Sequence, residues 1–124
     1  MKKGSLIFMT ALFILFSFVG SAMANKSSVS VEGPQTAEKG TEVTIRVTVN
    51  HKGNSFFHHT QWLKVLVNQN EIARWHYTGS QRPEAEQFTK EIKIKADGNM
   101  EVTAEASCNI HGSAGPVTVR ISVR

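Results

Sequence analysis

The chain has 124 residues, with 14 lysines and arginines against 10 acidic residues, which give a net charge of +4 when the histidines are neutral. The basic residues form no stripe with interleaved aromatic residues, so the composition argues against a nucleic-acid partner. The length suits one domain with a modest hydrophobic core. A single cysteine, Cys108, excludes a fold held together by internal disulfides.

The first 24 residues have the pattern of a secretory signal peptide. Two lysines follow the first methionine, residues 6–19 are almost wholly apolar, and Ala22-Met23-Ala24 supplies the small residues that a signal peptidase recognises. The apolar run is short for a membrane span, so we expect cleavage after Ala24 rather than a permanent anchor. The expected mature chain, residues 25–124, is periplasmic or secreted, has no membrane segment, and carries 12 basic against 10 acidic residues.

The mature chain has the pattern of short strands separated by turns. Residues 42–49 alternate between β-branched apolar and polar positions, which indicates a half-buried strand. Turn signals stand at Gly33-Pro34, Asn68-Gln69-Asn70 and Asp97-Gly98. The expected strands, in chain order, are 29–31, 42–49, 60–67, 72–78, a strand through Phe88, Ile92 and Ile94, 100–106 and 117–123. About seven such strands predict an all-β domain over residues 25–124, built as an antiparallel sandwich of two sheets.

Two aromatic features carry expectations about packing. Trp62 lies on the strand 60–67, and a tryptophan on a central strand of a sandwich is usually buried, so we expect it in the core. Phe56 and Phe57 precede that strand, and we expect them to pack beneath their loop.

Histidines and the cysteine gather at two places in the sequence. His51, His58 and His59 precede the strand 60–67, and His111 follows Cys108 with two residues between them. A C-x-x-H turn can present a thiolate and an imidazole to one ion, and Gly112 permits a tight backbone path after it. A thiolate with several imidazoles suits iron, copper or zinc rather than calcium or magnesium. A buried structural thiol and an intermolecular bridge are the alternatives for the cysteine.

Two segments carry a resemblance to a known family. Cys108-Asn109-Ile110-His111-Gly112 resembles the C-N-x-H-G signature of the superoxide reductases, the neelaredoxin and desulfoferrodoxin family. The segment from His58 to Val65 is similar to the H-x-x-x-W segment of that family, in which a ligand histidine opens a strand. The family has a further ligand histidine six residues earlier, whereas His51 lies seven before His58, so the loop between them must absorb one residue. The resemblance extends from about Glu38 to the C-terminus.

The resemblance implies an immunoglobulin-like β-sandwich with one mononuclear non-haem iron that alternates between Fe2+ and Fe3+. Four histidine nitrogens and one axial thiolate would hold it, with the sixth position open. Carried over by motif, Cys108 is the thiolate, and His51, His58 and His111 are histidine ligands. The implied activity is the reduction of superoxide to hydrogen peroxide with an external electron donor, which the sequence does not identify. Whether the chain forms a homo-oligomer is left open.

The chain also departs from the family pattern. The family's first ligand histidine stands in an E-K-H segment, whose lysine assists the binding and protonation of superoxide. Residues 25–50 contain no histidine, and Glu38-Lys39-Gly40 keeps the Glu-Lys pair but has glycine in the ligand position. His59 and His76 remain as sources of a fourth nitrogen, although His59 should face away from His58 on a strand and His76 suits a surface position.

These departures keep other functions open. The first alternative is a metal-binding or electron-transfer module without superoxide chemistry. Three histidines and one cysteine also suit zinc or copper, but a blue-copper site typically adds a methionine, and the mature chain has only Met100, at a turn. The second alternative is a partner-binding sandwich in which Cys108 acts as a carrier or attachment thiol.

Overall fold

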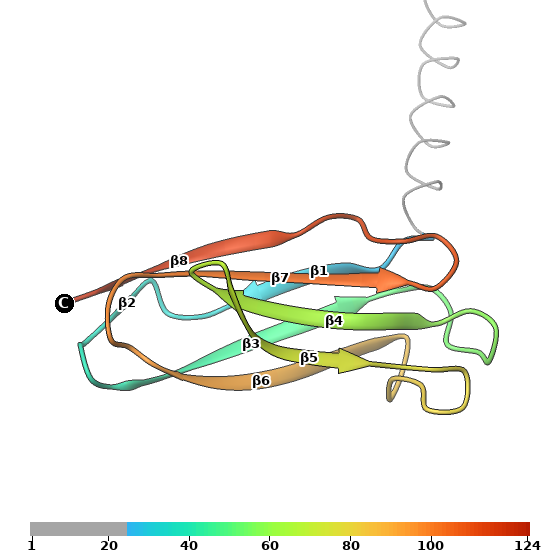
Figure 1. Ribbon diagram of the computed structural model, residues 1–124, viewed down its shortest axis with the longest axis horizontal. Helices are drawn as coiled ribbons and strands as arrows, with labels where there is room; N and C mark the ends of the chain where they lie inside the picture. Colours follow the sequence, from blue (N-terminus) through green and yellow to red (C-terminus); the bar gives the residue numbers. More distant parts are fainter. Residues whose placement is uncertain (1–24) are drawn as a thin grey trace, which may run out of the picture.

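A computed structural model describes residues 25–124, and all regular secondary structure in that part is β-structure. Two sheets pack face to face, one with the strand order β1-β3-β6 and one with the order β2-β8-β7-β4-β5 (Figure 1). The strands are β1 (Ser28–Glu32), β2 (Thr36–Ala37), β3 (Glu42–Asn50), β4 (Thr60–Val67), β5 (Asn70–His76), β6 (Gln87–Lys95), β7 (Met100–Cys108) and β8 (Val117–Val123). The predicted all-β, immunoglobulin-like sandwich is confirmed.

The seven predicted strands are all present, and the structure adds the short strand β2. This strand has two residues and pairs in parallel with β8, whereas the other named pairings are antiparallel. Two residues show no periodicity, so the sequence pattern could not reveal it. The predicted signal peptide lies outside the described residues. Across residues 25–124, no helix is long and apolar enough to cross a membrane.

The core lies between the sheets and follows from the alternation of the strands. In β3, Val43, Ile45, Val47 and Val49 are each at most 4% exposed, because every second residue of a strand faces the same side. The facing sheet contributes buried side chains from its central strands, namely Leu63, Val65, Val102, Ala104, Ala106 and Ile121. The burial of these residues holds β3, β4 and β7 in fixed positions.

Trp62 does not lie in the core, so that prediction is wrong. It stands on the outer face of the five-stranded sheet, where the cationic ends of Lys64 and Arg74 lie 5.3 and 5.7 Å from the centre of its ring. The inward positions of β4 belong to Leu63 and Val65. Lysine and arginine stems cover the ring, and cation–π attraction holds the charges over it. The tryptophan therefore stabilises the outer surface of the sheet.

Leu63 offers a direct test of the packing. Its side chain is fully buried on β4, between β7 and β5, so replacement by alanine should leave a cavity. Leu63→Ala should lower the free energy of unfolding by about 2–5 kcal/mol. Ile72→Ala is the matched control because Ile72 is 44% exposed, and it should change the stability by less than about 0.5 kcal/mol. Urea unfolding of both variants checks this, and equal effects would contradict the assigned core.

The topology brings three chain segments to one end of the sandwich. β3 ends at Asn50, β7 ends at Cys108, and β4 begins at Thr60, which pairs with Cys108 (Figure 1). His51 directly follows β3, and His58 and His59 directly precede β4. We call this end of the molecule the site end. Residues that are more than 40 positions apart in the sequence meet there.

Candidate metal centre

The sulfur of Cys108 lies at the last position of β7 and is held by its own turn. Cys108 is 3% exposed. Two backbone bonds close the turn, from Cys108 N–H to the Gly112 carbonyl at 2.9 Å and from Gly112 N–H to the Cys108 carbonyl at 3.1 Å. The N–H groups of Ile110 and His111 both donate to Sγ at 3.4 Å. These donors compensate negative charge on the sulfur, which suits a thiolate ligand. The burial of Cys108 disfavours a carrier thiol.

His51 is the buried imidazole of the site end. It is 7% exposed, and its Nδ1 lies 2.8 Å from the carbonyl oxygen of Gly53, which makes Nδ1 the protonated nitrogen. Its Nε2 is buried and has no hydrogen-bond partner. Desolvation by burial lowers the pKa of His51, although the Gly53 carbonyl acts in the opposite direction. A neutral ring with a free Nε2 lone pair is the form that binds a metal ion.

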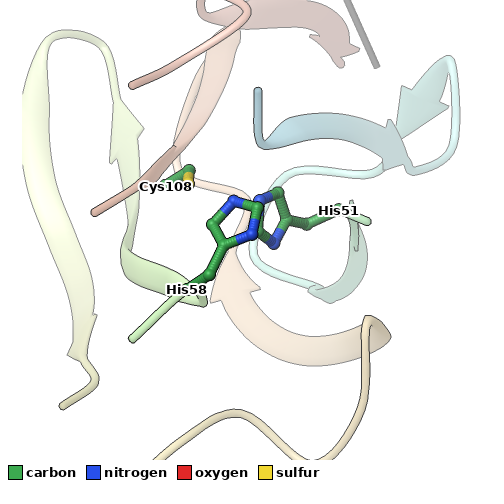
Figure 2. Close-up of side chains that lie close together, drawn as sticks. All are labelled: His51, His58 and Cys108. Atoms are coloured by element: carbon green, nitrogen blue, oxygen red, sulfur yellow. The ribbon is translucent and has the colours of Figure 1, made fainter. Parts of the chain in front are cut away.

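His58 and His111 complete a row of imidazoles. The rings of His51 and His58 lie 4.8 Å apart between centres, and those of His58 and His111 lie 5.0 Å apart. Nδ1 of His111 is 3.3 Å from Nε2 of His58 and 4.0 Å from Sγ of Cys108. One donor atom each of His51, His58 and Cys108 lies within 4.8 Å of the others, and the three side chains point toward one another (Figure 2). His111 adjoins this group through His58 and Cys108 but is not one of the three residues whose donor atoms are all mutually close.

The loop between His51 and His58 depends on Gly53. Gly53 has a φ of +127°, and a Cβ at this position would lie 2.8 Å from Nδ1 of His58. Its N–H donates to the carboxylate of Glu86, which fixes the loop to the start of β6. Another residue at this position would be strained, because a left-handed backbone is costly for residues other than glycine and a side chain would meet the His58 ring.

Replacement of Gly53 by alanine should therefore disturb the centre. Gly53→Ala should weaken Fe2+ binding by about tenfold, because strain of roughly 1–3 kcal/mol is relieved when the His58 ring turns away. Competition with a chromophoric chelator measures the affinity. Gly98→Ala is the control, since a Cβ there meets nothing within 4 Å. Equal affinities for both variants would show that the loop does not position His58.

Asn109 joins the turn of residues 108–112, which we call the cysteine turn, to the loop of residues 51–59, which we call the histidine loop. Its Nδ2 donates to the Phe57 carbonyl at 3.0 Å, and its Oδ1 accepts from the His59 N–H at 3.0 Å. Its backbone N–H donates to the His59 carbonyl at 3.1 Å. These bonds enclose His58 and fix it relative to Cys108. Phe56 and Phe57 are 57% and 78% exposed, so the expected packing beneath the loop is wrong.

The remaining candidate ligands lie elsewhere. His59 is buried, but its Nδ1 lies 3.1 Å from the Ser55 carbonyl, outside the group of close donors. His76 is exposed at the end of β5, opposite Trp62. Met100 begins β7 and Cys108 ends it, so about 26 Å of strand separates them. Met100 therefore cannot be an axial ligand at this site.

The pair Glu38-Lys39 does not reach the site. Lys39 N–H donates to the Arg124 carbonyl at 2.8 Å, and Gly40 N–H donates to the Ala96 carbonyl at 2.8 Å, at the opposite end of the sandwich. A different lysine lies near the donors: Lys26 lines a surface cleft together with His51 and Lys52. Lys26 carries no motif in the sequence, although it is the second residue of the predicted mature chain.

The donors fit a transition-metal ion. Donor atoms held about 2.0–2.3 Å from one ion lie at most about 4.6 Å apart. One donor atom each of His51, His58 and Cys108 lies within 4.8 Å of the others, so a small shift of the side chains would let them share an ion. The buried Nε2 of His51 lacks a partner, and an ion in this place would satisfy it. Thiolate and imidazole donors suit iron, so the residues present fit the mononuclear iron that the sequence resemblance implies.

Comparison with solved structures finds the same fold. A superoxide reductase (neelaredoxin) from Ignicoccus hospitalis is 20% identical, with a TM-score of 0.63 over 80% of this chain and 82% of that chain. A candidate superoxide reductase from Thermotoga maritima is 23% identical, with a TM-score of 0.66 over 82% and 89% of the two chains. A CARDB domain from Pyrococcus furiosus, solved with di-metal ions, is 14% identical, with a TM-score of 0.59 over 79% and 87%.

Sequence comparison settles the family. No curated protein matches the chain. The sequence profile of the desulfoferrodoxin family, however, matches residues 20–113, which is about three quarters of the chain. This range contains the cysteine turn and the histidine loop of the site end. The chain therefore belongs to the desulfoferrodoxin family.

Proposed function

We propose that the protein reduces superoxide to hydrogen peroxide at one iron ion held by Cys108, His51, His58 and His111. The observation that supports this most is that His51, whose buried Nε2 has no hydrogen-bond partner, lies in one group of close donors with His58 and the buried Cys108. The desulfoferrodoxin family binds mononuclear iron, and the donors at the site end are compatible with it. Bound there, the iron would supply the electron for the reaction.

The reaction balances with one electron and two protons. One superoxide ion takes up both and leaves as hydrogen peroxide, and an external one-electron reductant of unidentified nature restores the centre. The buried thiolate of Cys108 would donate negative charge to the iron. The N–H groups of Ile110 and His111 hold the sulfur in position. Burial lowers the pKa of His51, which favours the neutral ring, and this ring would bind through Nε2.

Lysines next to the donors favour an anionic substrate. Lys26 and Lys52 line the cleft beside His51, with Glu86 as the single acidic residue of that lining. Positive charge at the mouth of a cleft raises the association rate of an anion. Lys26→Met should therefore lower the second-order rate constant with superoxide on the order of tenfold at low ionic strength, and less at high salt.

The matched control is Lys39→Met, which removes the same charge at the opposite end of the sandwich. Pulse radiolysis of the ferrous protein measures both rate constants. Lys39→Met should leave the rate unchanged within twofold. Equal rates for the two variants would exclude a role of Lys26 in attracting the substrate.

The second candidate function is an electron-transfer or metal-binding module without superoxide chemistry. The position of Glu38-Lys39 far from the site favours it, because the family's assisting lysine is then not supplied by this pair. Mixing the ferrous protein with superoxide separates the two functions. The proposed reductase forms one hydrogen peroxide per iron oxidised and no dioxygen. A module without this activity is oxidised by ferricyanide but not by superoxide.

We also propose that the working protein is located in the periplasm or outside the cell. The support is the sequence of the first 24 residues, with its apolar run and A-x-A end. Fractionation of cells that produce the full chain, with N-terminal sequencing of the exported product, tests this. Retention of residues 1–24 on the isolated protein would overturn it.

A further inference from the structure

The site end supplies one nitrogen donor fewer than the family pattern requires. Within the described residues, the imidazoles that lie together with Cys108 are those of His51, His58 and His111. His59 and His76 lie outside this group. A centre with four nitrogens and one sulfur therefore needs another nitrogen from a group other than histidine.

The chain just after the predicted cleavage site is fixed against the cysteine turn. Ser27 N–H donates to the Gly112 carbonyl at 3.2 Å, and Ala114 N–H donates to the Ser27 carbonyl at 2.9 Å. Ser27 is fully buried, and its hydroxyl lies 2.8 Å from the hydroxyl of Thr60, the residue that pairs with Cys108. These contacts leave the segment before Ser27 little freedom to move away from the site.

Asn25 lies close to the site end. Two residues of chain span at most about 7 Å, so the nitrogen of Asn25 lies within about 7 Å of the Ser27 nitrogen, which donates to the cysteine turn. The residue between them, Lys26, lines the same surface cleft as His51. The backbone of Asn25 is therefore within reach of the donors.

We propose that signal cleavage after Ala24 completes the metal centre, because the α-amino nitrogen of Asn25 then becomes its fourth nitrogen ligand. The proposal rests on the iron site proposed above and on the predicted cleavage. With this amine, four nitrogens and the Cys108 sulfur would hold the ion.

The chemistry of the N-terminus explains why cleavage matters. In the uncleaved chain the nitrogen of Asn25 is a planar amide, whose lone pair is delocalised into the carbonyl and is a poor donor. A free α-amino nitrogen has no such delocalisation, so its lone pair is available to a metal ion, which displaces the proton on binding. Export and strong iron binding are thereby linked, because the precursor lacks one ligand.

Two chains that differ only at the N-terminus test the proposal. One begins at Asn25, and the other carries Gly-Ser before Asn25, which retains an amide at this position, as in the full chain. Both are loaded with Fe2+, and a chelator competition gives the affinities. The extension should weaken Fe2+ binding by at least about tenfold. Loss of a residue that only supports a ligand costs about tenfold or more, so loss of a direct ligand should cost no less.

Pulsed electron paramagnetic resonance of the ferric protein identifies the ligand itself. Both chains are produced with 15N only in the α-amino position of asparagine. The chain that begins at Asn25 should show a strong 15N coupling, and the extended chain should lack it. The other asparagines are labelled in both chains and serve as an internal control.

The outcomes separate this inference from the proposed function. Equal affinities, or no strong 15N coupling, would overturn the amine ligand while the iron site stands. Failure of both chains to bind Fe2+ would overturn the iron site and the amine ligand together. An exported protein that begins at a residue other than Asn25 would also exclude the amine ligand.

Discussion

Cys108→Ser should remove the charge-transfer absorption of the ferric protein and lower its iron affinity by at least about 100-fold. Loss of a residue that only supports a ligand costs up to about 100-fold, so loss of the ligand itself should cost at least as much. The sulfur is buried, and two backbone N–H groups point at it. A serine hydroxyl in this place is neutral at pH 7 and is a harder, weaker donor to iron. Visible absorption and chelator competition measure both effects.

The control for this experiment is Ser107→Ala. Ser107 is the neighbour of Cys108 on β7, is 9% exposed, and its hydroxyl donates only to the Cys108 carbonyl at 3.4 Å. Its loss should leave the absorption band in place. A Cys108→Ser protein that keeps the band would show that the sulfur is not a ligand.

His51→Ala is expected to lower the iron affinity by a similar factor, at least about 100-fold. The Gly53 carbonyl accepts a hydrogen bond from Nδ1 and so keeps the proton there, which leaves the Nε2 lone pair free for the ion. Loss of the ring removes this ligand. Free Fe2+ at 100 times its dissociation constant stabilises the native protein by about 2.7 kcal/mol, and the variant should lose most of this stabilisation. Thermal unfolding with and without Fe2+ measures the difference.

His76→Ala is the matched control for His51→Ala. Both changes remove one imidazole, but His76 is exposed on β5 and lies outside the group of donors. It should bind Fe2+ within twofold of the unchanged protein and gain the same stabilisation. Equal losses in the two variants would contradict the assignment of His51.

The sequence predicts the sandwich well because its strands alternate clearly. The β-branched residues of β3 mark one buried face, and the turn at Asn68 and Gln69, with φ angles of 51° and 71°, has the left-handed backbone that a tight hairpin needs. Trp62 was misplaced because an amphipathic ring is stable on either face when cationic side chains cover it.

The candidate site is predictable only in part. The motifs identify His58, Cys108 and His111 by local spacing, and the structure brings His51 to them through the left-handed Gly53. The position of Lys26 beside His51 could not be predicted, because no local pattern says that residues 26–27 run beside β3 and the cysteine turn. The Glu38-Lys39 pair resembles the family's E-K-H segment in sequence, but the fold holds it away from the site end.

The most direct test of the account is metal analysis with visible absorption of the mature protein, isolated without a tag and then oxidised. We expect about one iron per chain, as for a single-ion site of these donors, together with a thiolate-to-ferric absorption band. Zinc in place of iron, or no metal, would contradict the proposed centre and leave a structural site or an interaction domain.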